Sequence, residues 1–87
     1  MNIEETLKLK IQDSLKSEGL SLDVNDIIIE TSKTPEHGDY ASNVALKFAS
    51  RFGLAPRDLA TKIANNIDKE VVEKVEIAGP GFVNFFV

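Results

Sequence analysis

The C-terminal part of this sequence constrains the fold most. Residues 71–78 alternate apolar and polar side chains, and the Gly79-Pro80-Gly81 sequence that follows is typical of a tight turn. Residues 82–87 (FVNFFV) are then apolar on both faces of a strand, because side chains alternate sides along a strand. The pattern predicts a hairpin whose second strand presents one face to the core and carries Phe82 and Asn84 on the other.

The cost of burying an amide decides which face is the inner one. A buried carboxamide needs several hydrogen-bond partners, so we expect Val83 and Phe85 to point inward and Phe82 with Asn84 to point outward. An exposed ring beside a group that donates and accepts hydrogen bonds suits an unstacked nucleobase, which needs a stacking surface and a partner for its edge. The alternative is that Phe82 covers a sheet edge and Asn84 hydrogen-bonds the turn.

Apolar periodicity predicts the first two elements of the chain. Apolar residues recur every four positions after Asn2, which has the spacing of a capping box with Glu5, and Gly19 is a plausible stop. This predicts a helix between Asn2 and Gly19. The β-branched run 27–31 predicts a short strand.

Two more helices are expected before the hairpin. Apolar residues at helical spacing cover residues 41–52, with Asp39 or Ser42 as the N-terminal cap, and residues 56–67 follow with a proline at the first helical position. The element order is then α-β-α-α-β-β. It predicts a single α+β domain over residues 1–87, with its helices packed on one face of a small, mainly antiparallel sheet.

The distribution of charge is more informative than its total. The 87 residues carry a net charge of −4, which argues against binding nucleic acid through bulk electrostatics. Residues 41–67, however, carry four cations against one acid, Asp58, a net charge of +3. These cations are candidate phosphate contacts, although for any single one of them a solvated helix face is the better interpretation: Lys47, Arg51, Arg57 and Lys62.

Other residues invite catalytic or metal-binding interpretations that their spacing does not support. His37, Asp39 and Ser42 lie within six positions, whereas a catalytic triad draws its members from separate elements. We therefore expect His37 to lie at the surface or to be hydrogen-bonded locally, and we expect no catalytic residue. With one histidine and no cysteine, we expect no metal site. The charged N-terminus and the lack of a long apolar run predict a cytoplasmic protein with no membrane contact.

Three blocks in this order resemble the N-terminal domain of arginyl-tRNA synthetases. They cover nearly the whole chain: Pro35-Glu36-His37-Gly38-Asp39-Tyr40-Ala41-Ser42-Asn43, Pro56-Arg57-Asp58-Leu59-Ala60 and Ala78-Gly79-Pro80-Gly81-Phe82-Val83-Asn84-Phe85. The resemblance implies a module ahead of a class I catalytic core that docks on the outer corner of tRNA(Arg) and contacts its D-loop. An aromatic residue and an amide after the Gly-Pro-Gly turn engage a D-loop base in that family, and the matching residues are Phe82 and Asn84.

The resemblance also indicates which features of the family are missing from this sequence. Relatives with Tyr at the position of Phe82 have a hydroxyl that this chain does not. The His-x-Gly-His and Lys-Met-Ser-Lys-Ser signatures of class I synthetases do not occur, so ATP with Mg²⁺ and arginine are expected in a larger parent with catalytic and anticodon-binding domains. No cofactor and no DNA partner are expected for the domain itself.

The sequence leaves the role of the turn and of the domain open. The glycines Gly79 and Gly81 are candidate tRNA contacts because they would let an RNA backbone come close. A structural spacer that packs Phe82 and Phe86 against the catalytic domain without touching RNA is the alternative function. A small enzyme that uses His37 and Asp39 is a third hypothesis, and it requires turnover by the chain alone.

Overall fold

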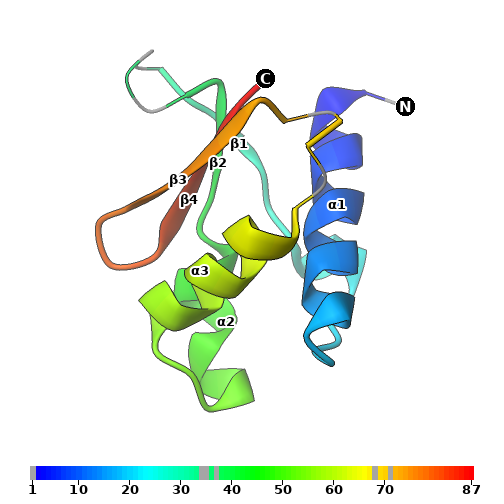
Figure 1. Ribbon diagram of the computed structural model, residues 1–87, viewed down its shortest axis with the longest axis vertical. Helices are drawn as coiled ribbons and strands as arrows, with labels where there is room; N and C mark the ends of the chain where they lie inside the picture. Colours follow the sequence, from blue (N-terminus) through cyan, green and yellow to red (C-terminus); the bar gives the residue numbers. More distant parts are fainter. Residues whose placement is uncertain (1, 34–35, 37, 68, 71) are drawn as a thin grey trace.

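The computed structural model describes residues 2–87 except 34–35, 37, 68 and 71. This part of the chain forms α-helices and an antiparallel sheet (Figure 1). The helices are α1 (Ile3–Ser17), η1 (Val24–Asp26), α2 (Val44–Phe48), η3 (Ala49–Phe52) and α3 (Pro56–Asn66), of which η1 and η3 are short 3-10 helices. The strands are β1 (Glu30–Thr31), β2 (Tyr40–Ser42), β3 (Lys74–Ala78) and β4 (Phe82–Phe86).

The sheet has the strand order β1-β2-β4-β3, and all neighbouring strands are antiparallel. The helices lie on one side of it (Figure 1), which confirms the predicted α+β class. β4 occupies the centre, so that Asn84 lies opposite Ala41 of β2 and opposite Glu76 of β3. The last strand of the chain is therefore held by hydrogen bonds on both edges.

The core lies between the helices and the inner face of the sheet. α1 contributes Leu7, Ile11 and Leu15 and α3 contributes Leu59 and Ile63, all at most 1% exposed. The buried Ser14 hydroxyl donates to the Ile63 carbonyl at 2.8 Å and joins the two helices. The side chain of Asn2 accepts from the Glu5 amide at 2.8 Å, which confirms the predicted start of α1.

The segment expected to be one helix over residues 41–52 is divided, and that prediction is wrong at its start. Residues 40–42 form β2, and α2 begins only at Val44. The Ser42 hydroxyl donates to the Ile28 carbonyl at 2.7 Å and accepts from the Val44 amide at 3.2 Å. The N-cap of α2 is Asn43 and not Ser42, which instead belongs to β2. The backbone of residues 40–42 pairs with β4, a long-range contact that overrides the local helical pattern.

Asp39, the other residue expected to cap this helix, does not cap it. Its carboxylate accepts from the Val87 amide at 2.9 Å, and its own amide donates to the Phe85 carbonyl at 2.8 Å. Asp39 therefore extends the contact between β2 and β4. The predicted strand over residues 27–31 is also shorter than expected, because only Glu30 and Thr31 pair with β2.

Gly38 sits where the chain approaches β4 most closely. Its φ is +83°, and a Cβ atom there would lie 2.6 Å from the Phe85 carbonyl oxygen. Only glycine combines this left-handed backbone with that approach. Among the described residues, no helix is both long and apolar enough to cross a membrane.

Candidate nucleic-acid interface

The two faces of β4 have opposite environments. Val83 and Phe85 are completely buried against the helices, whereas Phe82 is 39% exposed. Phe82, Asn84 and Phe86 share the face that the helices leave uncovered, because alternate residues of a strand point to the same side. The predicted inward positions of Val83 and Phe85 and the outward position of Phe82 are confirmed.

The Phe82 ring stands beside residues with little or no side chain. Across β3 its partner is Ala78, and a Cβ atom built on Gly79 would lie 3.7 Å from Cδ2 of the ring. Small neighbours leave part of the ring exposed to solvent. Exposure of an aromatic ring is one requirement of base stacking.

Asn84 is more enclosed than the sequence suggested. It lies on the predicted face, but its position on the central strand, between Ala41 and Glu76, leaves it only 7% exposed. The expectation of a freely protruding amide is wrong for this reason. In the described residues every buried side-chain nitrogen or oxygen atom has a partner, and no side-chain hydrogen bond of Asn84 occurs. The carboxamide atoms of Asn84 therefore reach the surface, recessed beside the Phe82 ring.

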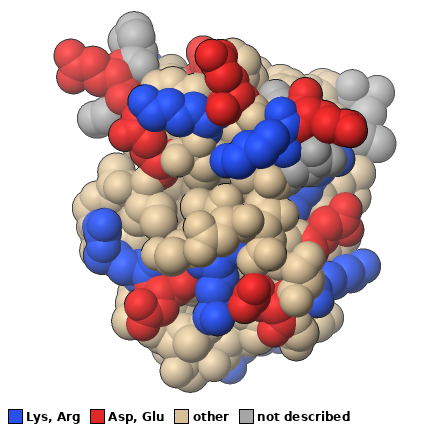
Figure 2. Space-filling model, in the orientation of Figure 1, with Lys and Arg blue, Asp and Glu red and all other residues tan. Residues whose placement is uncertain are grey.

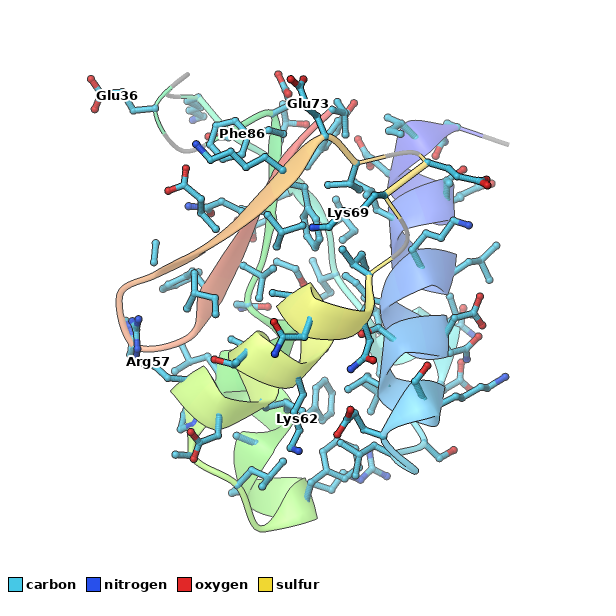
Figure 3. All side chains as sticks on the ribbon, in the orientation of Figure 1. Glu36, Arg57, Lys62, Lys69, Glu73 and Phe86 are labelled. Atoms are coloured by element: carbon cyan, nitrogen blue, oxygen red, sulfur yellow. The ribbon has the colours of Figure 1, made fainter. Side chains whose placement is uncertain are left out.

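The turn that carries Phe82 is fastened to the start of α3. A Cβ atom on Gly81 would lie 2.9 Å from Cβ of Pro56. This close packing explains why position 81 requires glycine. The Arg57 guanidinium donates from Nη1 to the Gly79 carbonyl. Figure 3 shows Arg57 against the turn between β3 and β4.

The four cations of the basic segment are not brought together. Lys62 projects from α3 toward the end of α1 (Figure 3), where its Nζ lies 3.0 Å from Glu18 Oε1. Hydrogen bonds from Lys62 and then from Asn66 hold the pKa of Glu18 below its ordinary value. Lys62 is thus paired with a carboxylate at the far end of α3 from the hairpin turn.

The other two cations lie around a different aromatic ring. Lys47 Nζ is 5.5 Å and Arg51 Cζ 5.8 Å from the centre of the Phe48 ring, close enough for cation–π attraction. Of the four candidates, Arg57 is thus the one in contact with the hairpin. On the face shown in Figure 2, cationic and anionic side chains are interspersed, in keeping with a site that does not depend on bulk charge.

Two charged residues of β3 share this face, as expected from the alternation of residues 71–78. Lys74 Nζ lies 2.8 Å from Glu76 Oε1 and 4.9 Å from the centre of the Phe86 ring. The register of the hairpin pairs Ala78 with Phe82, which places Glu76 opposite Asn84 and Lys74 opposite Phe86. The predicted surface position of His37 lies outside the described residues.

Known proteins resemble this chain along its whole length. A sequence profile described as "Arginyl tRNA synthetase N terminal domain" matches residues 3–87. An arginine-tRNA ligase of Histophilus somni (strain 2336) is 41% identical over 87 residues, covering 99% of this chain and 15% of the relative. One of Pseudomonas putida (strain GB-1) is 42% identical over 85 residues, covering 97% of this chain and 14% of the relative.

A solved structure supports the same fold. The arginyl-tRNA synthetase of Thermus thermophilus superimposes with a TM-score of 0.79 at 20% identity, covering 99% of this chain and 14% of that one. This chain therefore spans about 15% of the length of the relatives that it matches. From the profile and the sequence identities together, the chain belongs to the family of arginyl-tRNA synthetase N-terminal domains.

Proposed function

We propose that this chain is the tRNA-binding N-terminal domain of an arginine-tRNA ligase and that it contacts the D-loop of tRNA(Arg). The observation that carries the proposal is the Phe82 ring, 39% exposed on the helix-free face of the sheet. Its strand is fixed on both edges, so the ring is held on a rigid support. A rigid, exposed aromatic ring suits the stacking of an unpaired base in a loop.

Asn84 supplies the second half of the proposed contact. Residues two apart on a strand are separated by about 7 Å, which is close to the width of a base. A base that stacks on Phe82 can therefore extend its edge over the Asn84 carboxamide, which both donates and accepts hydrogen bonds. Because Asn84 is recessed, a base can reach its carboxamide only by lying close to the surface of the sheet.

The chemistry of aminoacylation belongs to the rest of the parent in this proposal. The parent uses ATP with Mg²⁺ and arginine to charge tRNA(Arg) in its catalytic domain, and the present chain supplies a contact far from the reacting groups. Because the chain carries a net charge of −4, its own affinity for tRNA should be weak. Tethering to the other domains raises the effective concentration of this contact.

Replacing Phe82 tests the proposal. The measurement is the affinity of the 87-residue chain for a bacterial tRNA(Arg) transcript at low salt, for wild type, Phe82→Ala and Phe82→Leu. Loss of base stacking is worth about 1–3 kcal/mol, so Phe82→Ala should weaken binding by about 5- to 150-fold. Phe82→Leu keeps apolar bulk but no ring and should lose most of the same affinity.

The matched control is Leu46→Ala on α2. Leu46 is 38% exposed, nearly the same fraction as Phe82, so its removal deletes a comparable exposed apolar group away from the proposed site. It should leave the affinity unchanged. Wild-type affinity of a folded Phe82→Ala variant would contradict the proposal and favour a spacer that packs on another domain through this face.

A further inference from the structure

Arg57 and the Phe82 ring both lie against Gly79. The Arg57 guanidinium donates to the Gly79 carbonyl, and the Phe82 ring lies in van der Waals reach of a Cβ position on Gly79. The cation and the stacking surface are therefore neighbours, although they are 25 positions apart in the sequence. The packing of Gly81 on Pro56 keeps the turn and the start of α3 in this relation.

No described residue neutralises the charge of Arg57. In the described part of the chain Lys62 pairs with Glu18 and Lys74 pairs with Glu76, whereas Arg57 has no carboxylate within ion-pair distance. Its one hydrogen-bond partner there is a neutral carbonyl. An exposed cation of this kind keeps its electrostatic attraction for an incoming anion.

The chemistry of the guanidinium permits two simultaneous contacts. It carries five N–H donors in a planar fork, and the Gly79 carbonyl receives a bond from Nη1. Such an anchor restricts the side chain while other donors remain for a second acceptor. In RNA, the acceptor whose geometry matches this fork is a backbone phosphate.

We propose that Arg57 binds a backbone phosphate of the nucleotide whose base stacks on Phe82, or of its immediate neighbour in the RNA. The inference rests on the proposed function of Phe82 and adds a second chemical group to the same site. It also separates Arg57 from the other cations of the basic segment. The hydrogen bond to Gly79 makes the guanidinium part of the turn instead of a freely moving surface charge.

The salt dependence of binding tests this assignment. Each phosphate neutralised in single-stranded nucleic acid contributes about 0.7 to the slope of log K against log salt concentration. Arg57→Ala should therefore weaken binding of the chain to tRNA(Arg) and reduce the slope by about that amount. Lys16→Ala makes the same change of charge at an exposed position of α1 and should leave the slope as in wild type.

Two more variants separate the possible failures. Arg57→Lys keeps the charge but not the fork, so it should keep the slope and still bind several-fold more weakly than wild type. If Phe82→Ala weakens binding while Arg57→Ala keeps the wild-type slope, the phosphate assignment is overturned and the stacking site stands. If Phe82→Ala binds like wild type, the proposed function itself fails, and this inference fails with it.

Discussion

Alanine at position 38 is expected to lower the free energy of unfolding by about 2–4 kcal/mol, a large share of the stability of so small a domain. Gly38 has a φ of +83°, and an added Cβ would lie 2.6 Å from the Phe85 carbonyl oxygen. That oxygen accepts from the Asp39 amide, so it cannot move without disturbing the join between β2 and β4. Urea unfolding followed by circular dichroism measures the loss.

Gly53→Ala is the matched control for this prediction. Gly53 has a φ of +70°, but no heavy atom lies within 4 Å of its Cβ position. Its replacement should cost only the backbone strain of about 1–2 kcal/mol. Equal losses at the two positions would show that the close approach to β4 is not what requires glycine at position 38.

Phe85→Ala should have the largest effect of any substitution in β4, about 3–5 kcal/mol, because it leaves a cavity in the core. Phe85 is 0% exposed. A domain of this size is stable by only about 5–10 kcal/mol, so the variant should unfold at much lower urea concentration. Phe85→Leu retains most of the buried volume and should remain folded.

Phe82→Ala is the control on the same strand. Phe82 is 39% exposed, and its removal should change stability by less than about 1 kcal/mol. The same pair of variants therefore tests which face of β4 is buried. Comparable destabilisation by both would contradict the assignment of Phe82 to the outer face.

Local patterns were sufficient for the elements that are stabilised locally. The start of α1 depends on Asn2 and its neighbours, and the hairpin depends on its own Gly-Pro-Gly turn, so both could be predicted from the sequence. β2 could not, because Tyr40–Ser42 adjoins a helical pattern and becomes a strand by pairing with β1 on one edge and with β4, more than 40 positions away, on the other. Non-local pairing leaves little trace in a short segment.

Non-local pairing also explains which predictions about the site were right and which were wrong. The exposure of Phe82 follows from alternation along one strand, which the sequence contains. The enclosure of Asn84 depends on a neighbour on each side, and one of these is the unpredicted β2. Likewise, proximity in sequence grouped four cations that the helices direct to different places, so that Lys62 faces Glu18 and Arg57 faces the turn.

Chemical probing of tRNA(Arg) bases, with and without the wild-type chain, tests whether the chain contacts the D-loop. We expect a D-loop base to become protected on binding, and this protection to be lost with Phe82→Ala but not with Leu46→Ala. A D-loop that stays as reactive as in free tRNA while other bases become protected would contradict this expectation, as would D-loop protection that survives the loss of the Phe82 ring.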